Sequence, residues 1–268
     1  MPRLIQIENI KTFSSNTFRV IISLHLLLFA MVLLSISRIE LSLGEFAVSK
    51  LFQFPYVWEF FPWVASWFNL LLAVLMIVLT CNEYRYKTFR QQVMNGLHEG
   101  HLTLAKAYII LLIALYALVL VVVSGLVSGG MNKPGDAEWI NLAGFQSVGM
   151  YFVQTIAYMT LAYLFAVIFR NNGLSIILFI LYLFPGEVII RNLIFPSVES
   201  YFPAKLISGL TPFPELFTQQ LTTVPGSNLQ MGPAAPSTLS SGESAAIALL
   251  YTVIFVVISY VIQRKRSL

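Results

Sequence analysis

Long apolar windows separated by short polar segments organise this chain. A helix needs about 20 mostly apolar residues to cross the hydrocarbon core of a bilayer. Six windows approach that length, and charged residues, Asn or Gly end most of them. The windows therefore predict an all-α integral membrane protein with six transmembrane helices, at residues 20–37, 60–81, 105–128, 146–169, 174–190 and 245–262.

The segment before the first span is too short and too polar to cross a membrane. In residues 4–19, the apolar side chains of Leu4, Ile7, Ile10 and Phe13 recur every third position. This spacing favours a helix that lies in the membrane interface, with one apolar face toward the lipid. The alternative is a frayed leader before the first span.

The segment between the first two spans is rich in Phe, Tyr and Trp, and it contains Pro55 and Pro62. Trp and Tyr favour the level of the lipid headgroups, where an apolar ring and a polar tip are both accommodated. We therefore expect an interfacial loop with an aromatic belt, interrupted by the two prolines.

Residues 82–104 form the longest basic segment between spans. They contain good helix formers, Glu83 and Lys87 are four positions apart in the favourable order, and Gly96 is a typical helix stop. A plain hairpin would need only a few residues. We therefore expect the second span to continue as a helix beyond the membrane, to turn, and to return into the third span.

An apolar stripe marks this predicted helix, because Tyr86, Phe89 and Val93 are spaced to share one face, with Arg85 and Arg90 nearby. Such a stripe suits docking to another protein on the same side of the membrane. It equally suits binding to anionic lipid headgroups through the basic residues.

Residues 191–244 are the longest segment outside the spans. Their first part contains apolar runs that are too short to cross a bilayer, and residues 222–244 are rich in Pro, Gly, Ser and Thr. The short runs are compatible with helices that re-enter the outer leaflet, provided that protein or a water-lined cavity satisfies their backbone. The second part is expected to be an irregular loop.

Composition agrees with a membrane protein, because 57% of the 268 residues are hydrophobic and only 10% are charged. Soluble domains carry about 25% charged residues. The single cysteine, Cys81, excludes an internal disulfide and a zinc site made of several cysteines. The formal charge of +4 does not indicate nucleic-acid binding.

The few charges are distributed unevenly between the two predicted sides. With the N-terminus inside, 11 of the 16 Lys and Arg residues lie inside, whereas nine of the 12 acids lie outside. The positive-inside rule therefore favours six spans with both termini in the cytoplasm.

Ionisable groups within the predicted spans are scarce. His25 lies in the middle of the first span, and we expect a neutral ring bonded to a neighbouring helix, although intramembrane ionisable residues are also functional candidates. Glu187 follows Pro185-Gly186 near the end of the fifth span. It either lines an outer vestibule or extends to the interface, with Arg191 as a partner four residues on.

Other motifs argue against a metal site and a nucleotide-binding site in this chain. His98 and His101 have helical spacing, but no third metal ligand is evident. The phosphate-binding pattern GxxxxGK[ST] is absent. Residues 127–130 (VSGG) resemble part of an ATPase signature by chance, and the small residues Ser124, Gly125, Ser128 and Gly129 are expected to allow close helix packing.

The chain resembles the ABC-2 type permease family, the membrane subunits of ATP-binding-cassette (ABC) exporters. The resemblance rests on the topology and on residues 82–97 (NEYRYKTFRQQVMNGL), followed by Leu104-Ala105-Lys106. Family members carry there an acidic residue, a basic turn with Thr, a stretch with Leu or Gly, and a Lys that enters the third span. His98-Glu99 stands where the family usually has Ser-Arg.

The resemblance implies a division of labour between subunits. A coupling helix between spans two and three inserts into a separate ABC ATPase subunit, which binds ATP and Mg, so this chain is not itself an enzyme and carries no cofactor. A second permease, identical or different, completes the pathway in the bacterial plasma (inner) membrane. The alternative is an ATP-independent membrane scaffold or an accessory subunit of a larger complex.

The resemblance also assigns residues. Coupling to the ATPase falls to Glu83, Tyr86, Lys87, Phe89 and Arg90, and an outer gate or vestibule falls to Glu187, Arg191, Phe213 and Phe217.

Overall fold

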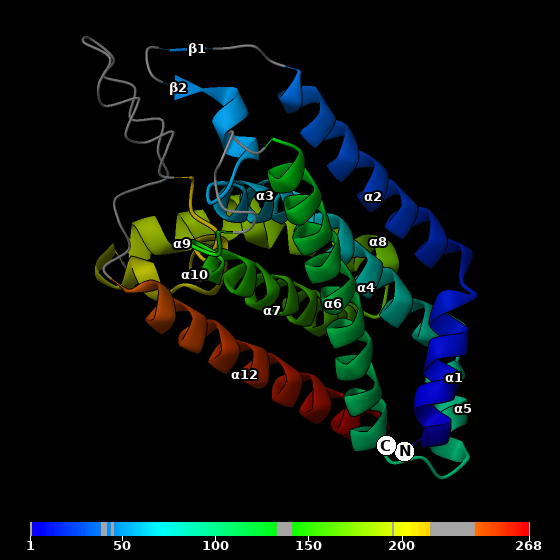
Figure 1. Ribbon diagram of the computed structural model, residues 1–268. Coiled ribbons are helices and arrows are strands. Elements are labelled where there is room, and N and C mark those ends of the chain that lie inside the picture. Colours follow the sequence, from blue (N-terminus) through cyan, green and yellow to red (C-terminus); the bar gives the residue numbers. More distant parts are fainter. Residues whose placement is uncertain are drawn as a thin grey trace.

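The computed structural model describes residues 2–38, 42–43, 46–132, 141–194, 196–214 and 239–267, and most of them are helical (Figure 1). The long helices are α2 (Asn16–Ser37), α4 (Asn69–Arg85), α6 (Glu99–Met131), α7 (Gln146–Phe169) and α12 (Ser241–Ser267). Shorter α-helices are α1 (Pro2–Phe13), α3 (Val57–Ser66), α5 (Thr88–Met94), α8 (Asn172–Leu181), α9 (Glu187–Ile194) and α10 (Pro203–Ser208). The remaining elements are η1 (Val48–Phe52), the π-helical turn η2 (Tyr182–Gly186), η3 (Pro196–Tyr201), and the two-residue antiparallel strands β1 (Ser42–Leu43) and β2 (Phe46–Ala47).

Five helical stretches are long and apolar enough to cross a membrane, and the bent pair α3–α4 would be a sixth if it is one span. The α3–α4 pair bends by 43°. Each predicted span falls within one of these stretches, and the predicted fourth span coincides with α7. The fifth is continuous from Asn172 to Leu193 and passes through the π-helical turn at Pro185. These helices indicate a multi-pass membrane protein.

Helix α7 forms the centre of the molecule. Within the apolar window of α7, 61% of the residues are buried, compared with 17% in α2 and in α12. Helices α3, α4, α6 and α12 all pack against it. Tyr151 and Tyr163 of α7 are fully buried, so the interior is built around this helix.

The aromatic segment before α4 belongs to this interior, and the predicted aromatic belt is wrong for most of its rings. Trp58, Phe60 and Phe61 are at most 1% exposed and lie in the main hydrophobic cluster. Pro62 does not interrupt the segment, because it lies inside α3. Tyr56 and Trp67, which are 37% and 55% exposed, remain available to an interface.

Small residues on α6 allow these aromatic rings to approach its backbone. A Cβ atom added to Gly125 would lie 2.9 Å from the Trp58 ring, and one added to Gly129 would lie 2.5 Å from the Phe54 ring. The predicted close packing around Gly125 and Gly129 is thus present, and its partners are aromatic side chains.

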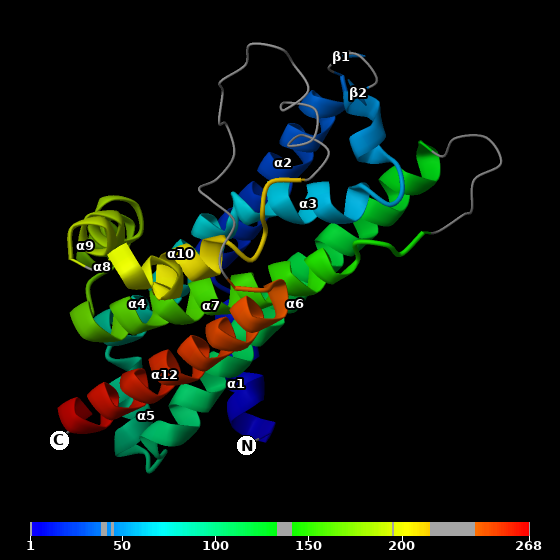
Figure 2. The same ribbon diagram turned by 90° about the vertical axis from the view of Figure 1, so that its left-hand side faces the viewer.

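The two ends of the molecule carry different elements. Both chain termini lie at one end, together with α1 and α5, and β1 and β2 lie at the opposite end (Figures 1 and 2). The helix predicted over residues 4–19 is divided, because α1 ends at Phe13 and residues 16–19 begin α2. Its predicted apolar face is divided as well, since Leu4 is buried whereas Ile7, Ile10 and Phe13 are exposed.

Candidate functional site

The turn between α4 and α5 reverses the chain at the end of the molecule that holds the termini. Helix α4 ends at Arg85, and Lys87 adopts a left-handed conformation with φ of 57°, which ends one helix and starts the next. The Thr88 hydroxyl donates a hydrogen bond of 3.3 Å to the Glu83 carbonyl oxygen. The second span therefore continues beyond residue 81 as predicted, but only to Arg85, and the separate short helix α5 follows the break at Lys87.

Helix α5 ends where the sequence predicts, at Gly96. This glycine has φ of 86°, its N–H donates to the Val93 carbonyl, and the Leu97 N–H donates to the Gln92 carbonyl. These two bonds form a Schellman motif, which satisfies the last carbonyl groups of a helix. His98 then caps the next helix, since its Nδ1 atom accepts from the Gly100 N–H at 3.2 Å.

The residues predicted to couple to an ATPase divide into two groups. Tyr86 is 66% exposed and Lys87 is exposed, whereas Glu83 and Phe89 are 4% and 9% exposed. Tyr86 and Phe89 do not share one face, because the break at Lys87 separates them. The side chain of Arg90 lies outside the described part of the chain.

An apolar contact holds α5 against the body of the protein. Phe89 packs with Leu4 of α1 and with Leu102 and Ala105 of α6. Its ring centroid lies 5.4 Å from that of Tyr84. Phe89 is therefore buried against α1 and α6, where it positions α5.

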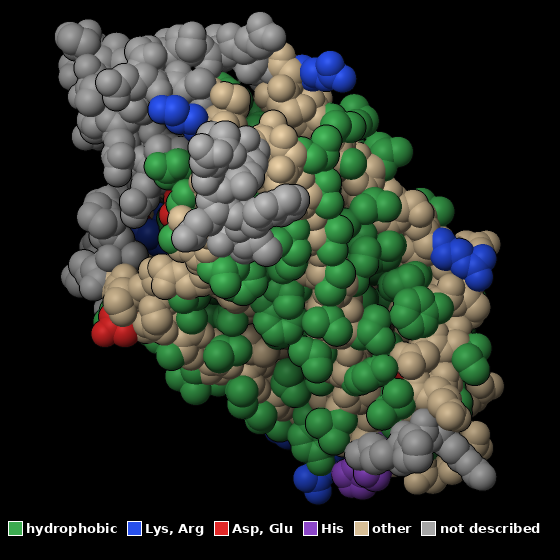
Figure 3. Space-filling model, in the orientation of Figure 1, with side chains coloured by type: hydrophobic (Ala, Val, Ile, Leu, Met, Phe, Trp, Pro, Cys, Tyr) green, Lys and Arg blue, Asp and Glu red, His purple; other side chains and the backbone are tan. Residues whose placement is uncertain are grey.

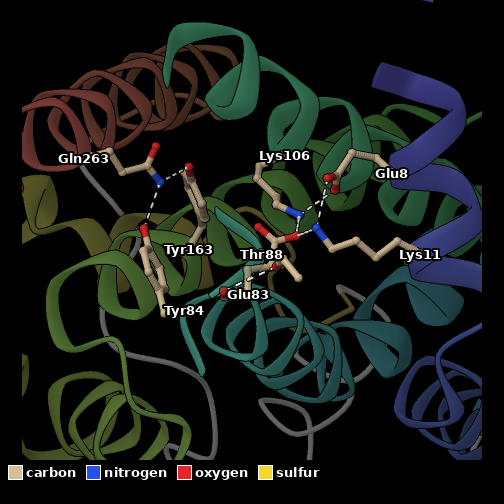
Figure 4. A network of polar contacts seen from close by, with 8 residues as sticks. All are labelled: Glu8, Lys11, Glu83, Tyr84, Thr88, Lys106, Tyr163 and Gln263. Carbon is tan, nitrogen blue, oxygen red and sulfur yellow. Dashed lines mark hydrogen bonds and ion pairs between the residues drawn. The ribbon is translucent and has the colours of Figure 1, made fainter. Parts of the chain in front are cut away.

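A cluster of four charged side chains, three of them buried and Lys11 half-buried, lies beside this turn (Figure 4). Lys106 of α6 donates to Glu8 of α1 at 2.6 Å and also pairs with Glu83 of α4. Lys11 of α1 pairs with Glu8 at 3.1 Å and also with Glu83. The predicted pair between Glu83 and Lys87 is therefore wrong, because Glu83 points toward Lys106 and Lys11.

The cluster is balanced, with two carboxylates and two ammonium groups. Glu8, Glu83 and Lys106 are each less than 7% exposed, so each charge depends on its partners. Burial alone would raise the pKa of Glu8, but the ammonium groups of Lys106 and Lys11 outweigh it and hold the pKa below its ordinary value.

A second polar chain extends from the same site to the C-terminal helix. Gln263 of α12 donates to the hydroxyl groups of Tyr84 at 3.2 Å and Tyr163 at 2.8 Å. Its carbonyl oxygen accepts from the hydroxyl of Thr103 at 2.9 Å. Helices α4, α6, α7 and α12 thus meet at one glutamine, beside the charged cluster (Figure 4).

The partners of Glu83 are not predicted from the sequence, although two signals point to them. Glu8 and Lys11 are three positions apart on α1, and Lys106 is the single Lys or Arg of α6, two turns from its start.

Glu187, the first residue of α9, is buried and caps the N-terminus of α10. It is 2% exposed and accepts hydrogen bonds of 2.7 Å from the Tyr182 hydroxyl and from the backbone N–H groups of Ala204 and Lys205. The alternative in which it extends to the interface is therefore wrong.

The predicted partnership between Glu187 and Arg191 is also replaced. Arg191 lies 3.7 Å from Glu199, which Lys205 also contacts. The hydrogen bond from Lys205 lowers the pKa of Glu199. Glu187, Arg191 and Lys205 nevertheless line one pocket of about 380 Å³.

The other predicted gate residues are placed in part. Phe213 packs edge-on against Trp63 with ring centroids 5.0 Å apart. Phe217 lies outside the described residues.

His25 is fully buried, and its Nδ1 atom lies 3.4 Å from the hydroxyl of Tyr116 on α6. This contact agrees with a ring bonded to a neighbouring helix. In the described part of the chain, no group of three or more His, Cys, Asp and Glu side chains is arranged to hold a metal ion.

Comparison with known proteins gives one match. A family model described as "Protein of unknown function (DUF2705)" matches residues 54–268, and the chain belongs to this family. No curated protein matches the chain. No solved structure matches it.

Proposed function

We propose that this chain is the membrane subunit of an ABC transporter, an exporter that a separate ATPase subunit drives. The observation that carries the proposal is the exposed turn at Tyr86 and Lys87 above a buried cluster of ion pairs. Through Glu83, the cluster joins the turn to Lys11 of α1 and to Lys106 of α6. A displacement of the turn would therefore be transmitted directly to α1 and α6.

The burial of the site residues suggests which of them contact the ATPase and which support the turn from inside. Tyr86 and Lys87 contact the ATPase, because their side chains are exposed. Glu83 and Phe89 hold the turn from inside, through ion pairs and through packing on α1 and α6. Arg90 lies on α5, as Phe89 does, and the resemblance to ABC-2 permeases assigns it to the contact with the ATPase.

The proposal assigns a second task to the opposite part of the fifth span. The π-helical turn at Tyr182–Gly186 interrupts the regular helix, and such turns are frequent at functional sites. Glu187 joins this turn to α10. Glu187, Arg191, Phe213 and Phe217 then border the outer gate of the pathway.

The complete transporter requires partners. A second permease, identical or different, closes the pathway with this one, and the surrounding lipid completes the environment. ATP and Mg bind to the ATPase subunit, so this chain performs no hydrolysis. Both termini face the cytoplasm of a bacterial inner membrane, in agreement with their position at one end of the molecule.

The test is co-purification from the native membrane, followed by ATP hydrolysis by the purified complex. The proposal predicts an ABC ATPase bound to the wild-type chain, and at least tenfold less of it bound to the double variant Tyr86→Asp, Lys87→Asp. The matched control is Met131→Asp, because Met131 is 81% exposed at the other end of α6. Recovery of a stable complex without any ATPase would favour the alternative, an ATP-independent scaffold or accessory subunit.

A further inference from the structure

A long apolar groove lies between α2 and α6, on the face shown in Figure 3. Its volume is about 930 Å³, within the range of about 300–1,000 Å³ that is typical of ligand pockets. Phe29 of α2, Phe52 of η1 and Phe61 of α3 contribute to its lining. Apolar side chains cover this face, and Lys and Arg side chains lie at its margins (Figure 3).

Apart from the Tyr116 hydroxyl, which contacts His25, the polar groups of the groove gather toward one end. From Leu26 to Leu34, the α2 side of the groove is apolar. The end away from the chain termini carries Ser37, Ser128 and Asn132. Arg38, the exposed residue that caps α2, follows directly after Ser37.

On its α2 side, the groove is about as long as one leaflet of a bilayer. It follows α2 from Leu26 to Ser37, roughly 16 Å at about 1.5 Å per residue, and it follows α6 from Leu112 to Asn132, roughly 30 Å. The hydrocarbon core is about 30 Å thick, so one leaflet contributes about 15 Å. An occupant with an apolar part of this length and a polar head at Ser37 therefore fits the groove.

A second copy of this chain is the other candidate occupant. If the axis of a symmetric dimer passed through the groove, the concave surface would face itself and remain unfilled. An acyl chain can follow the groove, and the guanidinium of Arg38 is suited to bind a phosphate group.

We propose that the groove between α2 and α6 binds one diacyl phospholipid as a resident ligand. Its acyl chains lie along α2 from Leu26 to Leu34, and its phosphate contacts Arg38. The hydroxyl groups of Ser37 and Ser128 and the amide of Asn132 lie at the level of the glycerol esters. The proposal does not depend on the ATPase partnership, because only the spans are involved.

The test uses the full chain purified in a mild detergent and incubated with an equimolar mixture of phosphatidylethanolamine and phosphatidylglycerol. Native mass spectrometry then measures how many phospholipids remain bound while the detergent washes are extended. The wild-type chain is expected to retain one phospholipid per chain after the bulk lipid is lost.

Matched variants on α2 distinguish the groove from the remaining lipid-facing surface. Leu34 lines the groove and is 63% exposed, whereas Met31 does not line it and is 56% exposed. Leu34→Trp should reduce the retained phospholipid at least fivefold, and Met31→Trp should retain it as the wild type does. Arg38→Gln should shorten the retention time in the washes.

Three outcomes would overturn the proposal. They are wild-type protein without retained phospholipid, equal retention by the Leu34→Trp and Met31→Trp variants, and a dimer that Leu34→Trp dissociates without a change in bound lipid. The last outcome would assign the groove to a second copy of the chain.

Discussion

Glu8 and Lys106 lie 98 positions apart in the chain and are joined by a hydrogen bond of 2.6 Å between their charged groups. This contact fixes the first helix to the third predicted span. Because Lys106 also pairs with Glu83, it joins α1, α4 and α6 at one buried nitrogen atom. Buried ion pairs contribute little net stability compared with apolar packing, but the loss of one partner is costly. We infer that the cluster fixes how the α4–α5 turn sits on the helices beneath it.

Removal of the central ammonium group should destabilise the protein strongly. In Lys106→Met, two buried carboxylates would face only Lys11, and we expect a loss of about 3–5 kcal/mol in the free energy of unfolding. Lys87→Met, at an exposed position, should change it by about 0.5 kcal/mol or less. Thermal unfolding in detergent would measure both, and equal effects of the two variants would contradict the assignment of Lys106.

The attachment of α1 should depend on pH through Glu8. The pKa of Glu8 in the folded protein lies below its ordinary value of 4.5, because Lys106 and Lys11 favour the ionised form despite burial. The stabilisation is therefore complete above about pH 4.5 and is lost as the pH falls through the lower folded-state pKa.

A spin label at Ile10, which is 70% exposed, would report this change as increased mobility in acid. Glu8→Gln should show the high mobility already at neutral pH, without the acid step. If the label were immobile at every pH in the Glu8→Gln variant, the ion pair would not be what holds α1.

Two adjacent glycines on α6 should respond in opposite directions. A Cβ at Gly129 would lie 2.5 Å from the Phe54 ring, whereas one at Gly130 would meet nothing within 4 Å. Gly129→Ala should lower the free energy of unfolding by about 1–3 kcal/mol through overpacking. Gly130→Ala should raise it by up to about 1 kcal/mol, because alanine favours the helix. Unfolding curves of both variants that shift in the same direction would refute the close contact.

Glu187 should hold α10 in place. Its carboxylate accepts two backbone N–H groups of α10 and one hydroxyl, so Glu187→Ala should cost about 1.5–3 kcal/mol for each charge-assisted bond that is not replaced by water. Hydrogen exchange of residues 203–208 measures this local loss. Glu199→Gln, which weakens the half-buried ion pairs with Arg191 and Lys205 but removes no bond to the α10 backbone, should change their exchange much less.

The helical windows were the part of the fold that the sequence could predict, because the length and apolarity of a span are local properties. The range 146–169 coincides with α7, and Gly96 ends α5 as its backbone freedom suggests. Small residues at Gly125 and Gly129 also marked a close approach, although not the aromatic rings that make it.

The interior contacts could not be predicted, because they depend on which helices meet. Trp58 and Phe61 have the composition of a headgroup belt, yet α3 packs them inside the protein. Lys87 looked like the partner of Glu83 by spacing, but a left-handed residue ends the helix before that spacing applies. The charges of Glu8 and Lys106 are visible in the sequence, but their contact is not, since it joins segments 98 positions apart.

A photo-crosslinking amino acid at Tyr86, with the same group at Met131 as the control, tests whether an ATPase attaches to the α4–α5 turn. In the native membrane, we expect an ABC ATPase to be crosslinked from Tyr86 and not from Met131, and we expect Lys87→Asp to reduce the yield. If no ABC ATPase is crosslinked from Tyr86, or if the yield from Met131 is equal, the α4–α5 turn is not the attachment site of a motor subunit.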